Sequence, residues 1–361
     1  MAILPPITTV GENKNFQFPF GALAHRPTFL LSPIVSDTPA IRRRWLAAAL
    51  RLFVLAVVCL AIQRTFRHAL DELSRYEWEL LPGWLVLSGV LYGIGLAPMA
   101  WFWHRTLGAL GQPAPWLAAF RAYYLGHLGK YVPGKALAVI LRVAAVKKWV
   151  PSIRIALVSG LLETLTMMAV GACLAAGLTL VVLQLEPHIA ALAAAMAIAA
   201  GVPTIPPIAR WLARLGIARL KDDADLPLPP VPADVGASLH GINVRLLASG
   251  WVAAGVCWLL LGLSLWAVLR GIGVEMLDPL SDLPRLVAAV AFAVVAGFLS
   301  MLPGGLVVRD ALLMRLLAPI CGEANALVAA VMLRLVWLLT EISVCGILYV
   351  ARSREQAVSK G

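Results

Sequence analysis

The sequence has little charge for its length. Only 14% of its 361 residues are charged and 61% are hydrophobic, whereas soluble domains carry roughly 25% charged residues. Residues 84–103, 189–208 and 246–269 contain no Asp, Glu, Lys or Arg at all. A helix of about 20 residues crosses a hydrocarbon core about 30 Å thick. The composition therefore excludes an ordinary soluble domain and predicts an all-α polytopic membrane protein, because backbone groups in lipid must be satisfied within the helix.

Several sequence signals of other protein classes are also missing. The five cysteines form no CxxC pair and have no metal-type spacing, and no nucleotide-binding GxxxxGK[ST] motif occurs. Residues 1–40 have no basic start followed by an apolar core, which excludes a secretory signal. We interpret this segment as a flexible cytoplasmic tail, or as the product of a start site placed too early. No cofactor, no metal ion and no catalytic residue is predicted.

Basic residues outnumber acidic ones, and the formal net charge is +11. They flank the apolar segments instead of gathering in a polar domain, which argues against nucleic acid as a partner and indicates membrane topology. The stretch "IRRRW" at 41–45 precedes the first apolar segment and places the N-terminus inside. The basic loop 209–245 and the tail 353–361 are then cytoplasmic as well. The expected location is a bacterial cytoplasmic (inner) membrane.

The hydrophobic segments predict one transmembrane domain over residues 41–352. It contains two re-entrant broken hairpins, at about 116–146 and 286–318, one entering from each face. Six full spans complete it, at about 45–63, 84–103, 155–185, 189–208, 246–269 and 325–350.

Each predicted hairpin contains a Pro-Gly pair inside an apolar run. The first is "YLGHLGKYVPGKALAVILRVAAVKK" (124–148) and the second is "FLSMLPGGLVVRDALLMRLL" (298–317). A shift of 170 positions places Pro133-Gly134 on Pro303-Gly304. Three full spans separate the two breaks, so the two copies are expected to have opposite orientation. Inverted repeats with interrupted helices point to a transport site near the midplane of the membrane.

Proline suits the first turn of a helix, so helices beginning near the two breaks would present free backbone N–H groups to an anion. Basic side chains beside each break would add to this site. A purely structural interpretation treats the breaks as ordinary turns, and Lys130 and Lys135 as cytoplasmic charges that set the topology. The predicted lipid- or phosphate-binding residues are Lys130, Tyr131, Pro133, Gly134, Lys135, Arg142, Pro303, Gly304, Gly305, Arg309 and Asp310.

Apart from Arg51, which lies near the start of the span at 45–63, three charges fall inside predicted spans. Glu163 is the only charge in the span at 155–185, and Arg334 and Glu341 are the only ones in the span at 325–350. A charge in a span costs about 2.5–3.5 kcal/mol, so each should face a partner or a wet cavity. The shift of 170 brings Glu163 next to Arg334. They are either a structural ion pair or part of a substrate or proton site.

The chain resembles the lysylphosphatidylglycerol synthase transmembrane-region family, whose members are also called flippase-like membrane proteins. The resemblance rests on "GHLGKYVPGKALAVILR" (126–142), Glu163, "LPGGLVVRDALL" (302–313) and Arg334. The family pattern PGG-Leu-Gly-x-Arg-Glu departs here, with Val307 for glycine and Asp310 for glutamate. The resemblance implies a lipid translocase without the aminoacyl-transferase domain that follows in bifunctional synthases.

The leading prediction is a transporter that moves an anionic or phosphate-bearing lipid between leaflets, such as a phospholipid or a polyprenyl-phosphate-linked lipid. Membrane lipids are then its partners. One alternative is a membrane glycosyltransferase that uses a lipid-linked sugar and the carboxylates of Asp71, Glu72, Glu77 and Glu79. Another is a non-catalytic subunit associated with lipid-biosynthesis enzymes. The sequence predicts no oligomeric state.

Overall fold

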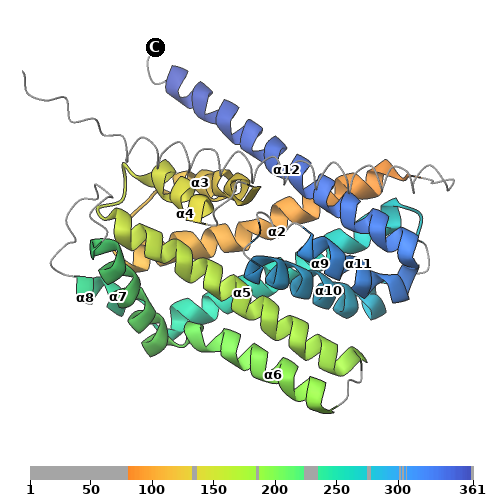
Figure 1. Cartoon of the computed structure of the whole chain (residues 1–361). Coiled ribbons are helices and arrows are strands. Elements are labelled where there is room, and N and C mark those ends of the chain that lie inside the picture. The colour runs from red at the N-terminus through yellow and green to blue at the C-terminus, as the bar shows by residue number, and fades with distance from the viewer. Residues whose placement is uncertain are drawn as a thin grey trace, which may run out of the picture. The chain divides into compact units, whose positions relative to one another are not determined.

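A computed structural model describes most of the chain after residue 79, and all of the described residues belong to one compact unit. Every regular element among them is a helix (Figure 1). Five described helices are long and apolar enough to cross a membrane. The prediction of an all-α polytopic membrane protein is confirmed, while the predicted span at 45–63 lies outside the described residues. The structure describes residues 80–131, 136–183, 187–222, 235–274, 278–300, 302, 305 and 307–358.

Four of the predicted spans correspond to long helices. These are α2 (Pro82–Ala109), α5 (Ile153–Leu183), α9 (Val244–Gly271) and α12 (Glu323–Val358). Each contains a candidate membrane span. Helix α12 continues to Val358, so much of the segment predicted as a C-terminal tail is helical.

One predicted span and one predicted hairpin limb differ from expectation. Helix α6 (Pro187–Gly201) has 15 residues, about 22 Å at 1.5 Å per residue, and is too short for the full span expected at 189–208. Prolines cause this ending, because Pro203 lies in the short 3₁₀ helix η2 (Val202–Thr204) and Pro206 begins the next helix. Conversely, α10 (Pro279–Leu299) contains a candidate span at Ser281–Leu299. The first limb of the hairpin expected at 286–318 is therefore longer than a half-membrane segment.

The first predicted hairpin contains two short helices. Helix α3 (Trp116–Leu128) ends in the 3₁₀ helix η1 (Gly129–Tyr131), and the next described element is α4 (Ala136–Val146). A Cβ atom on Gly126 would lie 2.8 Å from the carbonyl oxygen of Ala138, so glycine allows α3 and α4 to approach closely. Neither helix is among the candidate spans. The face of the membrane from which they enter stays a prediction.

The segment expected as a cytoplasmic loop at 209–245 is partly helical. It contains most of α7 (Pro206–Asp222) and all of α8 (Val235–His240). Ala209, Ala213 and Ile217 of α7 are buried against the first turns of α5. The opposite side of α7 exposes Trp211 and several arginines, which is the pattern of a helix lying at a membrane interface.

Helices α2 and α9 form the antiparallel centre of the bundle. At one end, the N–H of Leu81 donates to the carbonyl of Gly271 over 2.9 Å. At the other, Gly241 lies against the backbone of Ala109. About two turns in from the Leu81–Gly271 end, the hydroxyls of Ser88 and Ser264 each donate to the other residue's carbonyl, over 2.8 and 3.0 Å. Since polar groups are costly in an apolar interior, this reciprocal pair fixes the register of the two helices.

The element order repeats along the chain. Helices α2, α3, α4 and α5 are matched by α9, α10, α11 (Val308–Cys321) and α12. Helix α5 begins at residue 153 and α12 at residue 323, which is the predicted offset of 170. The antiparallel packing of α2 and α9, which open the two halves, is the geometry that an inverted repeat requires.

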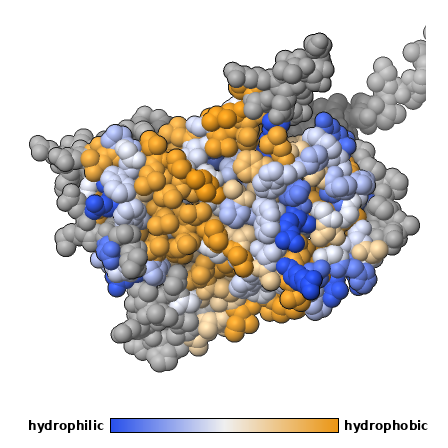
Figure 2. All heavy atoms as spheres, turned by 180° about the vertical axis from the view of Figure 1, so that it is seen from behind, coloured by the Kyte–Doolittle hydropathy of each residue, from blue (hydrophilic) through white to orange (hydrophobic). Residues whose placement is uncertain are grey.

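The outer surface is apolar, as expected for a chain surrounded by lipid. Figure 2 shows a broad hydrophobic area that covers much of one face, beside a smaller hydrophilic group. Large aliphatic side chains on several spans are exposed, including Val252 of α9 and Leu339 of α12. The buried interior is also mainly aliphatic, but it includes large aromatic side chains and the charged groups of the candidate site.

Candidate functional site

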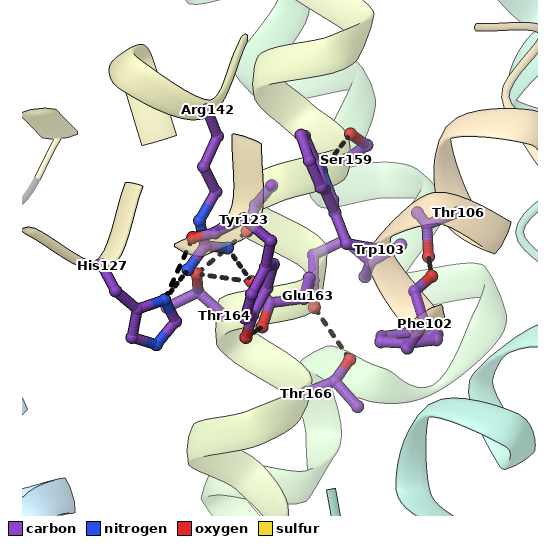
Figure 3. A network of polar contacts seen from close by, with 12 residues as sticks. Phe102, Trp103, Thr106, Tyr123, His127, Arg142, Ser159, Glu163, Thr164 and Thr166 are labelled. Carbon is purple, nitrogen blue, oxygen red and sulfur yellow. Dashed lines mark hydrogen bonds and ion pairs between the residues drawn. The ribbon is translucent and has the colours of Figure 1, made fainter. Parts of the chain in front are cut away.

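The first predicted hairpin carries a buried ion pair with the following span (Figure 3). Nη1 of Arg142 on α4 donates to Oε2 of Glu163 on α5 over 2.6 Å, and the Tyr123 hydroxyl of α3 donates to Oε1 over 2.8 Å. The guanidinium carbon of Arg142 lies 4.0 Å from the centre of the Tyr123 ring. Glu163 is 1% exposed. Burial of this carboxylate is tolerated because both of its oxygens accept hydrogen bonds.

His127 completes this first cluster. Its Nδ1 lies 3.2 Å from the carbonyl oxygen of Tyr123 and 3.4 Å from Nη2 of Arg142. The Thr164 hydroxyl donates to Oε2 of Glu163 over 3.3 Å. Figure 3 shows these side chains converging from α3, α4 and α5. The cluster therefore joins the three elements of the first repeat.

A second ion pair occupies the matching place in the second repeat. Asp310, in the first turn of α11, accepts from Nε of Arg309 over 3.0 Å and from Arg334 of α12. Arg309 and Asp310 are both 8% exposed. The expected pairing of Glu163 with Arg334 is wrong, because the carboxylate of each half pairs with a cation of the same half.

A third ion pair connects the two halves. Nζ of Lys130, in η1, donates to Oε1 of Glu341 on α12, and the Tyr92 hydroxyl of α2 donates to the same oxygen. Lys130 Nζ also lies 3.2 Å from the Tyr92 hydroxyl. Glu341 is 1% exposed although it lies in the middle of a long apolar helix. The predicted need for a partner of Glu341 is met by the first hairpin.

Two stacked aromatic rings lie between the hairpins. Tyr92 and Trp337 stack with their centres 4.5 Å apart and an interplanar angle of 11°. Lys130 Nζ lies 5.7 Å from the centre of the Tyr92 ring, and the guanidinium carbon of Arg309 lies 5.6 Å from the Trp337 ring. The indole N–H of Trp337 donates to Ser264 over 3.0 Å. A cation from each predicted hairpin thus contacts the same aromatic pair.

Sequence analysis missed the aromatic members of these clusters. Tyr92, Tyr123 and Trp337 are all buried, and each hydroxyl or indole N–H is hydrogen-bonded to a polar group of the site. The sequence did offer one signal, their distance from the ends of the spans, because Tyr and Trp in spans usually lie near the ends. Tyr92 is ten residues beyond the start of α2 and Trp337 is fourteen beyond the start of α12.

A groove of about 740 Å³ runs along the outer side of the same helices. It is lined by α2, α3 and α12, and its walls are almost entirely aliphatic or aromatic. Gly93 and Thr340, which line it, are the sequence neighbours of Tyr92 and Glu341. The Tyr124 hydroxyl donates to the carbonyl of Gly93 over 2.5 Å and satisfies a polar group of the wall. The groove and the charged cluster are therefore on two faces of the same helix segments.

Part of the predicted site is not described. Tyr131 is described only as the last residue of η1, and Pro133, Gly134, Lys135, Pro303 and Gly304 lie outside the described residues. Gly305 has φ +67°, and a Cβ atom there would lie 3.0 Å from Cα of Gly297 on α10. A turn conformation and close helix packing therefore account for this glycine. The carboxylates proposed for a glycosyltransferase, at 71, 72, 77 and 79, also lie outside the described part.

Within the described ranges, no group of three His, Cys, Asp or Glu side chains is placed to hold a metal ion. The arrangement instead combines buried cations, carboxylates that neutralise them, and an apolar groove beside them. It defines a polytopic membrane protein in which both halves of the chain contribute buried charged groups.

The chain belongs to the family described as the lysylphosphatidylglycerol synthase TM region, whose model matches residues 45–342. This confirms the resemblance found in the sequence motifs. No curated protein matches the chain. Membership indicates a membrane protein of lipid metabolism or transport.

Proposed function

We propose that the protein moves an anionic, phosphate-bearing lipid between the leaflets of a bacterial cytoplasmic membrane. The observation that carries this proposal is the convergence of Lys130 and Arg309, one from each hairpin, on the stacked Tyr92–Trp337 pair. Each half of the chain thus supplies a cation to a common place inside the bundle. A headgroup phosphate is the ligand that suits such cations.

In the described structure, carboxylates neutralise the buried cations of the site. Arg142 is bound by Glu163, Arg309 and Arg334 by Asp310, and Lys130 by Glu341. A phosphate that enters must replace a carboxylate on at least one cation. Such an exchange keeps the buried cation paired, so it avoids most of the cost of an isolated charge in a low-dielectric interior.

The apolar groove supports the same proposal. A lipid whose headgroup enters the charged site still needs a place for its acyl chains. The groove along α2, α3 and α12 is about 740 Å³ and its wall includes Val90, Ile94 and Leu339, which are exposed. Acyl chains in this groove would remain in an apolar environment while the headgroup is shielded by the bundle.

The distribution of charge between the two ends of the bundle supports an orientation with one end in the cytoplasm. Leu110, Ile155, Ala213 and Leu247 pack together and place the end of α2, the starts of α5 and α9, and α7 at one end of the bundle. Basic residues surround this end, whereas Asp278 and Asp282 cap the start of α10. The positive-inside rule assigns the basic end to the cytoplasm. Its basic residues include Arg105, Lys147, Lys148, Arg214, Arg219 and Arg245.

The test is reconstitution of the purified protein into phosphatidylcholine liposomes that contain acyl-labelled phosphatidylglycerol. Dithionite bleaches the label in the outer leaflet, so loss of the label that starts in the protected inner leaflet reports exchange between leaflets. The double variant Arg142→Gln/Glu163→Gln removes a buried pair together and so limits damage to the fold. We expect wild-type protein to exchange the lipid and the double variant to lose most of this activity.

The matched control is Arg285→Gln. Arg285 lies 3.6 Å from Asp282 in an exposed pair at the start of α10, away from the clusters. It should exchange lipid at the wild-type rate. If the double variant exchanges lipid at the wild-type rate, Arg142 and Glu163 do not form the headgroup site. Absence of exchange in the wild type, with several anionic lipids tested, would favour the non-catalytic subunit.

A further inference from the structure

The Lys130–Glu341 pair differs from the other two buried ion pairs in its chemistry. Arginine is effectively always protonated, so the cations of Arg142–Glu163 and Asp310–Arg334 do not change their charge. Lysine is able to lose its proton, and glutamate is able to gain one. Among the described residues, Lys130–Glu341 is the buried pair in which both partners are able to change protonation.

The oxygen atoms of the three buried carboxylates show the same contrast. Both oxygens of Glu163 and both oxygens of Asp310 accept hydrogen bonds. In Glu341, Oε1 accepts from both Tyr92 and Lys130. Its Oε2 is buried and has no hydrogen-bond partner among the described residues. An unpaired buried oxygen of a carboxylate is a place where a proton can be added without breaking an existing bond.

We propose that Glu341 is a proton-binding site that couples lipid movement to a proton gradient; this inference rests on the proposed function. A proton from water adds to Oε2, and the carboxylate becomes a neutral carboxylic acid. Lys130 keeps its own proton and is no longer neutralised by Glu341. Its ammonium group then binds the headgroup phosphate, so one proton accompanies one negative charge.

Access to water distinguishes the two partners. The side chain of Lys130 is 28% exposed, whereas that of Glu341 is fully buried. A proton therefore reaches Glu341 from the side of Lys130 and η1. Release follows when the phosphate leaves and the ammonium again attracts the carboxylate, which returns the proton to water. Buried ionisable residues with these properties are typical of proton relays in membrane transporters.

Other titratable groups near Glu341 are compatible with this assignment. Tyr92 donates to Oε1 and leaves Oε2 available. The Cys345 thiol, one helical turn further along α12, interacts electrostatically with Glu341. On the side of α3, His127 interacts electrostatically with Lys130. None of them donates to Oε2, so the proton added there comes from water.

The experiment uses the full chain in phosphatidylcholine liposomes with acyl-labelled phosphatidylglycerol and an enclosed pH-sensitive dye. For one proton per lipid, a gradient of one pH unit should change the leaflet ratio of labelled lipid about tenfold. The dye should record proton movement that follows lipid movement. Glu341→Gln should abolish both effects of the gradient, because the amide binds no proton.

Asp282→Asn makes the same carboxylate-to-amide change outside the buried site, where Asp282 is partly buried and pairs with the exposed Arg285. It should respond to the gradient like the wild type. A second variant, Lys130→Arg, keeps the positive charge but supplies parallel N–H groups that can donate to both oxygens of Glu341 and so occupy Oε2. Proton movement should be lost in this variant as well, which keeps the proposal testable if Glu341→Gln does not fold.

The outcomes separate this inference from the proposed function. Wild-type lipid exchange that ignores the gradient and moves no protons overturns proton coupling and leaves translocation standing. If the wild type moves no lipid, infrared difference spectra between acidic and alkaline samples still test the proton site. A protonated-carboxyl band that Glu341→Gln removes supports it, and a spectrum unchanged by Glu341→Gln overturns it.

Discussion

Arg142 donates a 2.6 Å hydrogen bond to Glu163, and the charges of this pair are exchanged in the second half of the chain. In the first half, the short helix α4 carries the cation and the span α5 carries the carboxylate. In the second half, α11 carries Asp310 and the span α12 carries Arg334. Each short helix is therefore tied to the span that follows it, and the two ties have opposite polarity.

The Arg142–Glu163 tie should contribute strongly to stability. Removal of one partner leaves an uncompensated buried charge, which typically costs about 3–5 kcal/mol. We expect Glu163→Gln and Arg142→Gln each to lower the unfolding temperature in detergent markedly. The double variant should be more stable than the sum of the single losses predicts, because the remaining residues are neutral. Thermal unfolding of all four proteins measures this coupling, and additive losses would contradict it.

Asp310 should matter more to stability than either of its arginine partners. Its two oxygens accept from Arg309 and Arg334, so Asp310→Asn removes the negative charge that both guanidinium groups share. Arg334→Gln leaves Asp310 still bonded to Arg309. We therefore expect Asp310→Asn to lower the unfolding temperature more than Arg334→Gln does. Arg315→Gln on the exposed side of α11 is the control and should have little effect.

Gly126 should be required for the packing of α3 on α4. A Cβ atom at this position would lie 2.2 Å from Cγ of Arg142 and 2.8 Å from the carbonyl of Ala138. Gly126→Ala should therefore displace α4 and weaken the Arg142–Glu163 pair. Gly108→Ala in α2 is the matched control, since no atom lies within 4 Å of its added Cβ. The control should be neutral or slightly stabilising, because alanine is the better helix former. Equal unfolding temperatures for the two variants would argue against this close contact.

Hydrophobic length alone was sufficient to predict the helices that cross the bundle without interruption. Segments at 84–103, 155–185, 246–269 and 325–350 all lie in long helices. It failed where two signals conflicted. Segment 189–208 was predicted as a full span because it has no charge. Pro203 and Pro206 nevertheless end its helix, since proline interrupts apolar and polar helices alike. Because a Pro-Gly break follows α10, much of this segment was predicted as the limb of a hairpin at 286–318. Helix α10 is itself as long as a span.

The sequence indicated which charged residues need a partner, but not which residues pair with one another. Arg142, Glu163, Asp310, Arg334 and Glu341 are all buried or partly buried and ion-paired, as charges inside spans must be. Their partners depend on which helix faces lie together, and pseudo-symmetry suggested the wrong pair. Sequence position does not give the helix rotation that brings Lys130 to Glu341 and Arg142 to Glu163.

The apolar groove offers a test that leaves the charged groups in place. Ala97 of α2 lines the groove beside Phe120 and Tyr124 of α3. Ala97→Phe should fill part of its volume and slow the exchange of labelled lipid at least severalfold, because acyl chains lose their apolar path. The Glu163 and Glu341 pairs are untouched, so the unfolding temperature should stay close to that of the wild type.

Ala248→Phe is the matched control for this groove variant. Ala248 is exposed on α9 and does not line the groove, so the same increase in volume projects toward lipid. Its lipid exchange should equal that of the wild type. Wild-type exchange in Ala97→Phe would show that acyl chains take another route. Equal slowing by both variants would instead indicate a general effect of added bulk on the bundle, and the groove would lose its assigned role.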